Sequence, residues 1–197
     1  MDCSPLTLVG HYVTLEPLTR AHLPDIQRAA ADGELWKLFF TSVPSPESTE
    51  QWIKTALDMQ QQQTAVVFVI RENQTGHIVG STRYFKMEPQ NKRLEIGHTW
   101  YSKSVQRTGI NTECKLLLLT HAFEVFGCIA VEFRTDHFNH RSQAAIERLG
   151  AKRDGLLRNH IIMPDGRIRD TVVYSILEHE WQGVKKNLQY MQKKYAS

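Results

Sequence analysis

Hydrophobic and polar residues alternate near the start of the chain, and this period of two predicts a first strand over residues 6–18. Apolar residues at helical spacing then predict two helices, over residues 19–33 and 48–61. Three antiparallel strands follow, over residues 65–71, 77–86 and 94–101. Gly97 interrupts the last of these strands, which indicates a bulge or a close approach of another backbone.

The second half of the chain opens with the strongest helical pattern. A stripe of leucine and phenylalanine side chains predicts a long helix over residues 111–126, with Gly127 as its stop. The remaining elements are a strand, a helix, the two strands of a hairpin and a short terminal helix, over residues 129–134, 139–149, 155–162, 171–177 and from 181 onward. Together they predict one mixed α/β domain, with a mostly antiparallel sheet of six or seven strands and about four helices. We place this domain at residues 1–180 and a lysine-rich helix or tail at residues 181–197.

The composition is that of a folded domain rather than of a disordered chain. Of the 197 residues, 41% are hydrophobic and 23% are charged. The longest apolar runs, Ala65–Ile70 and Leu116–Leu119, are far shorter than the roughly 20 residues that a membrane span needs. The segment after Met1 has no basic region followed by an apolar one, as a signal peptide would have. We therefore expect a soluble, cytoplasmic protein with no membrane partner.

Charge and cysteine content argue against several kinds of site. The formal net charge of +3 is too small to indicate direct nucleic-acid binding without a clustered basic face. The lysines of the terminal helix could touch RNA, but solvated surface is the commoner role of such residues. The three cysteines form no Cys-x-x-Cys pair, and His137 and His140 have no further ligand at metal-binding spacing. We therefore expect no metal, and we place Cys114 and Cys128 in the core.

The loop over residues 104–113 joins a strand to the long helix and is the most informative segment about chemistry. Unpaired backbone N–H groups at a helix N-terminus, next to a loop with a glycine, form a site that suits a phosphate or pyrophosphate. Arg107 adds a positive charge to this loop. The alternative is an ordinary turn in which Gly109 only supplies an unusual backbone angle. The glycine patterns of P-loop and dinucleotide-binding proteins are both absent from this loop.

The run from Gln106 to Asn111 resembles the pyrophosphate-binding loop of the GNAT acetyltransferases, which reads Gln/Arg-x-x-Gly-x-Gly/Ala. Asn111 departs from the small residue that is usual at the last position. Further stretches are similar to the GNAT branch that contains the ribosomal-protein N-terminal acetyltransferases, namely residues 106–115, 116–123, 139–142, 165–167 and 169–171. The resemblance covers about residues 6–180 and implies the GNAT fold, with its sheet splayed between the fourth and fifth strands.

The resemblance also implies a site for acetyl-CoA as cosubstrate. The pantetheine arm would pair with the free backbone of Thr99, Trp100 and Tyr101 like an added strand. Backbone N–H groups at the bulge would point at the thioester oxygen, which becomes an oxyanion when an amine attacks. The expected pyrophosphate-binding residues are Gln106, Arg107, Thr108, Gly109, Ile110, Asn111 and Thr112.

The departing thiolate needs a proton donor. Many GNAT enzymes use a tyrosine seven residues after an asparagine, but Ile146 stands at that position here. In the branch that this chain resembles, a serine three residues after the asparagine contacts the sulfur. The resemblance therefore assigns Asn139 and Ser142 to the cofactor site, and Ser142 also to catalysis. Without this resemblance, the sequence predicts only that Asn139 caps a helix and that Ser142 is an ordinary residue of its first turn.

Glu95 and His98 are the candidates for the general base. Regular alternation places them on opposite faces of the strand unless Gly97 carries a bulge. Related enzymes have a carboxylate near the position of Ile161, which this chain lacks, and His160 is adjacent. Two alternatives stay open, because Glu95 could be a solvated strand carboxylate and water could serve as the base.

The acceptor is expected to be a primary amine that attacks the thioester directly, most simply the N-terminal α-amine of a protein. The aromatic residues Trp36, Phe39 and Phe40 are expected to line the acceptor groove, although packing onto the sheet explains them equally well. The alternatives are a small amine, an amino acid, an antibiotic, or a coenzyme A-binding regulatory module without turnover. The chain could also form a homodimer, although no sequence feature indicates one.

Overall fold

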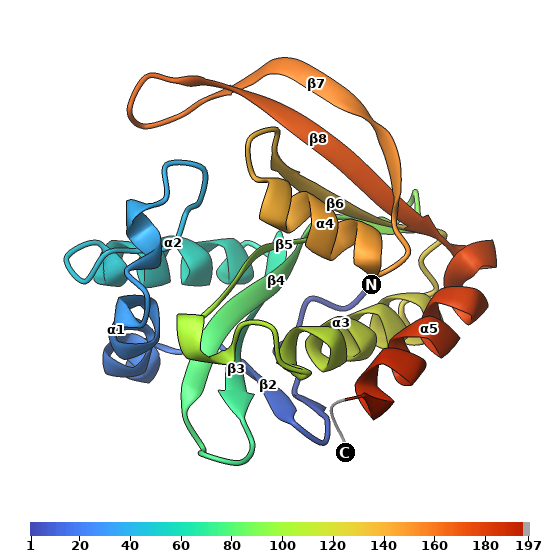
Figure 1. The fold of residues 1–197 in the computed structure, drawn as a ribbon, viewed down its shortest axis with the longest axis horizontal. Coiled ribbons are helices and arrows are strands. Elements are labelled where there is room, and N and C mark those ends of the chain that lie inside the picture. The colour runs from blue at the N-terminus through green and yellow to red at the C-terminus, as the bar shows by residue number, and fades with distance from the viewer. Residues whose placement is uncertain (195–197) are drawn as a thin grey trace.

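The computed structural model describes residues 1–194, in which eight strands and five α-helices are found (Figure 1). The strands are Leu8–Val9 (β1), Val13–Pro17 (β2), Ala65–Glu72 (β3), Ile78–Glu88 (β4), Arg93–Tyr101 (β5), Ala130–Asp136 (β6), Lys152–Ile162 (β7) and Ile168–Leu177 (β8). The helices are Leu23–Ala31 (α1), Thr49–Gln61 (α2), Ile110–Thr120 (α3), His140–Arg148 (α4) and Trp181–Lys193 (α5).

All of the strands belong to one sheet with the order β1-β2-β3-β4-β5-β6-β8-β7. Neighbouring strands run antiparallel except β5 and β6, which run parallel and are connected through α3. The predicted mixed, mostly antiparallel sheet is thereby confirmed. The described part of the chain has eight strands, where six or seven are expected, and its five helices are the four expected in the domain together with the expected terminal helix.

One extra strand arises because the predicted first strand over residues 6–18 is divided in two. The chain turns between β1 and β2, where the Gly10 N–H donates to the Val13 carbonyl at 2.8 Å. The Glu113 carboxylate of α3 accepts the N–H groups of His11, Tyr12 and Val13 at 2.6–2.9 Å. This turn depends on a carboxylate about a hundred residues away, so local alternation alone did not predict it.

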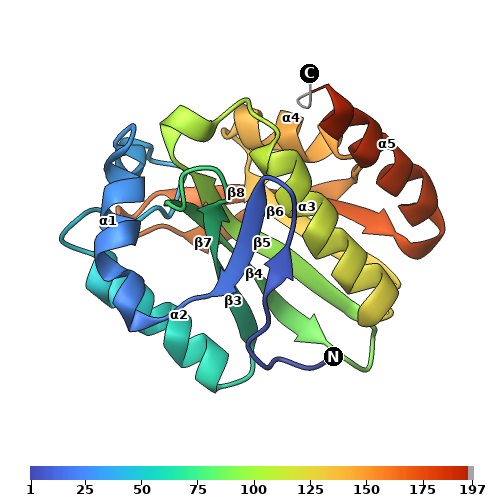
Figure 2. The ribbon, with the colours of Figure 1, turned by 90° about the horizontal axis from the view of Figure 1, so that it is seen from below.

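The helices cover the two faces of the sheet as separate groups (Figure 2). α1 and α2 lie on one face, over a cluster of buried side chains that includes Val67, Val69 and Phe85. α3, α4 and α5 lie on the opposite face, over a larger cluster that includes Phe68 and Tyr84. Alternate residues of β3 therefore supply both cores, which explains why its sequence is a continuous apolar run.

The predicted long helix over residues 111–126 changes its geometry near its end. α3 ends at Thr120, and the chain continues as one π-helical turn over His121–Val125. Gly127 follows with a φ of 65°, which confirms its predicted role as the stop of the helix.

The terminal helix α5 lies against α3 and shares the core of that face. Its residues Trp181, Val184 and Leu188 are buried, and the Trp181 indole donates to Glu124 at 2.7 Å. Residues 195–197 of the predicted tail lie outside the described residues. None of the helices in residues 1–194 combines the length and the apolar character that crossing a membrane requires.

Candidate functional site

β5 and β6 are joined only at their beginnings. Their ladder runs from Arg93 opposite Ala130 to Glu95 opposite Glu132, and within the described residues no further pair continues it. Beyond Glu95, the edge of β5 that faces β6 is therefore free of strand partners up to Tyr101. This divergence is the predicted splay between the fourth and fifth strands of the sequence analysis.

A bulge interrupts β5 at the place where its edge becomes free. Arg83 of β4 lies opposite Gly97 and Ser81 lies opposite Trp100, so two residues of β5 face one residue of β4. His98 takes a φ of 49°, which is uncommon for a residue with a side chain. A Cβ atom on Gly97 would come within 2.6 Å of the Phe85 ring, which explains the glycine.

The bulge brings Glu95 and His98 to the same face of the sheet. Glu95 lies opposite Phe85 in the ladder, and the His98 ring contacts the Phe85 ring with their centroids 5.0 Å apart. Phe85 belongs to the core beneath α1 and α2, so both base candidates lie on this face. Thr99 points the other way, because its hydroxyl lies 2.9 Å from the Nζ of Lys115 on α3.

The loop before α3 is held against the end of β5 by Gln106. Its amide Nε2 donates to the Tyr101 carbonyl at 2.9 Å, and its Oε1 accepts from the Arg141 guanidinium of α4 at 2.7 Å. Gln106 thereby links the end of β5 to α4. Arg107 is exposed and has a φ of 66°, so its side chain extends from a left-handed turn into solvent.

Gly109 has a φ of −68°, which any residue adopts, so the alternative that it supplies an unusual backbone angle is wrong. The rest of the loop presents mainly its backbone. The Thr108 hydroxyl donates to the Val105 carbonyl at 2.7 Å, whereas Ile110 and Thr112 are buried and Asn111 is half-buried. The first N–H groups of a helix have no intrahelical acceptor, so this end of α3 can bind an anion.

Asn139 caps α4 on the other side of the splay. Its Oδ1 accepts the Ser142 N–H at 3.0 Å, so the side chain performs the capping role that was the alternative to cofactor binding. The cap fixes Ser142 in the first turn of the helix, where its side chain is half-buried. Ile146 is buried in the core, so the position that often holds the tyrosine has a packed apolar side chain here.

Glu95 is a buried carboxylate within a cluster of charges. Its Oε2 accepts from Lys86 at 2.9 Å and lies 3.5 Å from the Arg134 Nε, and Arg134 also binds Glu132 at 2.7 Å. Burial raises the pKa of Glu95, and the two neighbouring cations oppose this rise. These residues line a hollow of about 340 Å³, so Glu95 is more than a solvated strand carboxylate.

His98 differs from Glu95 in its electrostatic surroundings. His98 is exposed at the surface, but the surrounding protein atoms partly desolvate its imidazole and lower its pKa. The positive charges of Arg83, Lys86 and Arg169 lower that pKa further. His98 is therefore neutral at neutral pH and has little affinity for a proton.

Sequence reasoning did not identify Asp136 as part of this face. Its carboxylate is almost fully buried and accepts from Arg167 at 2.7 Å, while the Arg169 Nε lies 3.9 Å away. The sequence singles out the motifs at 165–167 and 169–171 by their resemblance alone. The arginines of these motifs connect the β7–β8 hairpin to the end of β6 through Asp136. In the same hairpin, His160 shares a hydrogen bond of 3.0 Å with Thr171.

The predicted aromatic residues divide into two groups. Phe39 is exposed and contacts the Phe40 ring, and the Arg167 guanidinium lies over it at 5.0 Å from the ring centroid. It therefore links the segment before α2 with the turn of the β7–β8 hairpin, which reaches toward that segment in Figure 1. Trp36 instead packs against the core beneath α1 and α2, as the alternative interpretation held.

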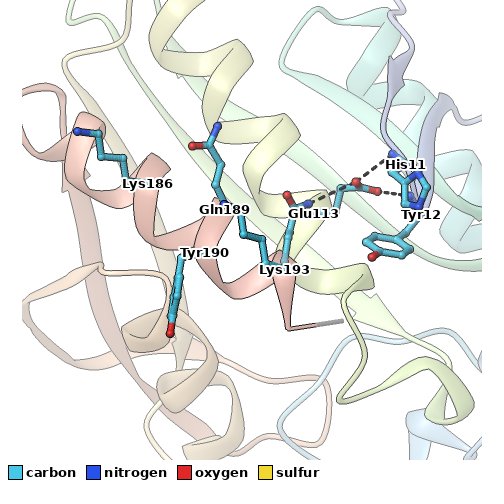
Figure 3. A pocket seen from close by; sticks show the side chains of 8 residues that line it. His11, Tyr12, Glu113, Lys186, Gln189, Tyr190 and Lys193 are labelled. Atoms are coloured by element: carbon cyan, nitrogen blue, oxygen red, sulfur yellow. Dashed lines mark hydrogen bonds between the residues drawn. The ribbon is translucent and has the colours of Figure 1, made fainter. Parts of the chain in front are cut away.

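A second hollow of about 580 Å³ lies away from the predicted residues. α5 and the turn between β1 and β2 line it, together with Glu113 (Figure 3). None of the predicted catalytic, cofactor-binding or acceptor residues is among its lining residues within the described chain.

The two cysteines predicted to lie in the core, Cys114 and Cys128, are fully buried, and burial raises the pKa of both thiols.

Comparison with known proteins gives results consistent with this geometry. The family description "Acetyltransferase (GNAT) domain" matches residues 13–152. A protein of Bacillus subtilis (strain 168), provisionally named ribosomal N-acetyltransferase YdaF, is 28% identical over 188 residues, which cover 90% of this chain and 97% of that protein.

Two solved structures illustrate the structural similarity. A crystal structure provisionally described as an acetyltransferase from T. thermophilus has a TM-score of 0.83 and 38% identity, covering 97% of this chain and 99% of that one. RimL, described as a ribosomal L7/L12 alpha-N-protein acetyltransferase, has a TM-score of 0.75 and 20% identity, covering 88% and 94%. At that identity, the second similarity concerns the fold alone.

Proposed function

Because this chain belongs to the GNAT acetyltransferase family, we propose that it transfers the acetyl group of acetyl-CoA to the N-terminal α-amine of a protein. Membership makes the chain an N-acetyltransferase, and members of this family use acetyl-CoA. The observation that carries the proposal is the free edge of β5, which lies between the N-terminal end of α3 and the capped N-terminal end of α4.

The donor site in this proposal is the splay itself. The pantetheine arm pairs with the free backbone of Thr99, Trp100 and Tyr101, in the way that a peptide adds to a sheet edge. The pyrophosphate binds the N–H groups from Gln106 to Thr112, where Arg107 supplies a cation. This arrangement leaves the acetyl group at the bulge around His98.

The reaction is a direct transfer between the two bound substrates. The lone pair of the acceptor nitrogen forms a bond to the carbonyl carbon, and the C=O electrons move to oxygen, where N–H groups at the bulge stabilise them. When the carbonyl forms again, the C–S bond breaks and sulfur leaves with the electron pair. Ser142 donates a hydrogen bond to this thiolate from the first turn of α4. Cys114 and Cys128 are too deeply buried for a covalent acetyl intermediate.

The acceptor site in this proposal is the opposite face of the splay. Glu95 takes the proton that the attacking nitrogen loses, because its raised pKa makes it a better base than an ordinary carboxylate. An α-amine, with a pKa of about 7.7–8.0, needs only modest help from such a base. Phe39 and Phe40 form the apolar wall of the groove. The name of YdaF, which describes a ribosomal N-acetyltransferase, supports a ribosomal protein as the source of the acceptor amine.

Two matched peptides test this acceptor assignment. One has a free N-terminus and a blocked lysine, and the other has a blocked N-terminus and a free lysine at the same distance from the end. With isotope-labelled acetyl-CoA and the full chain, mass spectrometry should detect label on the first peptide only. Transfer to the lysine peptide, or only to small amines and amino acids, would overturn the N-terminal assignment.

A further inference from the structure

Lys115 has a buried ammonium group in the splay. It belongs to α3, its side chain points toward β5, and the residue is only 6% exposed. Its Nζ donates to the Thr99 hydroxyl of β5 at 2.9 Å and lies 5.8 Å from the centre of the Phe133 ring of β6. The ammonium therefore reaches from α3 into the region where β5 and β6 have separated.

The surroundings of Lys115 compensate its positive charge only in part. Among the described residues no carboxylate forms an ion pair with it, and Cys114 on the same helix is the ionisable group that acts on it. An ammonium has three N–H donors, and the Thr99 hydroxyl accepts from it while sharing a further hydrogen bond with Thr82 at 2.8 Å. Burying a cation without an anionic partner costs free energy, and a ligand that develops negative charge in the splay would offset this cost.

We propose that Lys115 binds the sulfur atom of coenzyme A and stabilises the thiolate that forms when the acetyl group leaves. This inference rests on the donor site proposed above, because it needs the thioester to lie at the bulge beside Thr99. In the transfer, the C–S electron pair stays on sulfur, and Lys115 provides positive charge for it without forming a covalent bond. The proton that the acceptor nitrogen releases passes to the base, and the thiolate takes up a proton from water after the product leaves.

The role of Lys115 differs from that of Ser142. Ser142 offers a neutral hydrogen-bond donor from α4, whereas Lys115 offers a full charge from α3. Burial lowers the pKa of Lys115 to about 8, so the group is still mostly protonated at neutral pH. A charge removed from water interacts more strongly with a nearby thiolate than an exposed lysine would.

The ionisation of the coenzyme A thiol in the complex tests this proposal without any acceptor. The full chain is saturated with coenzyme A, and the ultraviolet absorbance of the thiolate is followed as the pH is raised. We expect the ionisation constant of the bound thiol to be about 10- to 1000-fold larger in the wild type than in Lys115→Met, which is the usual effect of one adjacent charge. Lys115→Arg keeps the charge and should stay close to the wild type.

Desulfo-coenzyme A, which lacks the sulfur, is the matched ligand. Calorimetry should show that Lys115→Met leaves its affinity unchanged, whereas a loss for both ligands would mean that Lys115 only shapes the site. Equal ionisation constants in the wild type and Lys115→Met, or in Lys115→Arg and Lys115→Met, would overturn the proposal. If the wild type bound neither ligand, the donor site itself would be wrong, while failure on the peptides above would concern the acceptor alone.

Discussion

Ser142 occupies the first turn of α4, and Asn139 holds that turn in place through its cap. Replacing Ser142 with alanine keeps the backbone N–H that Asn139 accepts and removes only the hydroxyl. We expect kcat to fall by roughly 10²- to 10⁴-fold, because the hydrogen bond that stabilises the departing thiolate is lost, with little change in acetyl-CoA affinity. Steady-state kinetics and calorimetry measure the two quantities.

A fall confined to KM would mean that Ser142 positions the cofactor and takes no part in the departure of the thiolate. Unchanged kcat in a folded Ser142→Ala variant, measured where chemistry limits the rate, would contradict the assignment.

Glu95 and His98 lie on the same face of the sheet and differ in their affinity for a proton. The pKa of Glu95 is raised and that of His98 is lowered, so Glu95 is the stronger base of the two near neutral pH. Glu95→Gln should lower kcat/KM most between the raised pKa of Glu95 and the α-amine pKa of about 7.7–8.0, where the amine must lose a proton. Above this range the amine is already neutral, so the two pH profiles should converge.

His98→Ala is the matched comparison, and its effect on kcat/KM should not depend on pH in this way. If Glu95→Gln lost the same factor at every pH, Glu95 would not be the base. The pH profile of His98→Ala would then show whether His98 or water takes the proton.

The loop before α3 offers a test at the level of an element. The φ of −68° at Gly109 is close to the value that a proline ring fixes, so Gly109→Pro removes an N–H without straining its own backbone angle. Losing one hydrogen bond to a charged pyrophosphate should weaken acetyl-CoA binding by about tenfold to a hundredfold. Gly109→Ala keeps the N–H and is the control in the same calorimetric titration. Wild-type affinity in a folded Gly109→Pro variant would show that this end of α3 does not bind the pyrophosphate.

α3 also organises the turn between β1 and β2 through Glu113. Its carboxylate accepts three backbone N–H groups, which Glu113→Ala would leave without their acceptor. We expect the free energy of unfolding to fall by about 3 kcal/mol, whereas Glu113→Gln keeps one acceptor oxygen and should lose less. Urea denaturation of both variants measures this difference. Equal stability of Glu113→Ala and the wild type would show that the turn forms without the carboxylate.

Most elements could be predicted from the sequence because their signals are local. The hairpin of β3 and β4, the helix that follows the loop, and the bulge beside Gly97 all follow from periodicity or from a glycine. The division of β1 from β2 could not be predicted in this way, because it depends on Glu113. The π-helical turn over His121–Val125 also lacks a local signal that distinguishes it from the rest of the helix.

For the whole molecule, the two proposed substrate sites lie on opposite faces of the sheet and meet in the splay. The donor loop and α4 lie toward the α3 face, and Glu95, His98 and the Phe39 contact lie toward the α1 and α2 face. The motif Gln106–Asn111 points to the first proposed site through resemblance alone. Asp136, Arg167 and Lys115 were missed, because their importance arises from contacts between elements that are distant in sequence.

The central claim is that acetyl-CoA lies along the free edge of β5, and amide hydrogen exchange of the full chain tests it directly. Exchange is followed by mass spectrometry with and without saturating acetyl-CoA. The account predicts slower exchange over residues 97–101 and 106–112, where N–H groups acquire acceptors on the ligand. Unchanged exchange in both segments, with protection instead around the hollow beside α5, would contradict it.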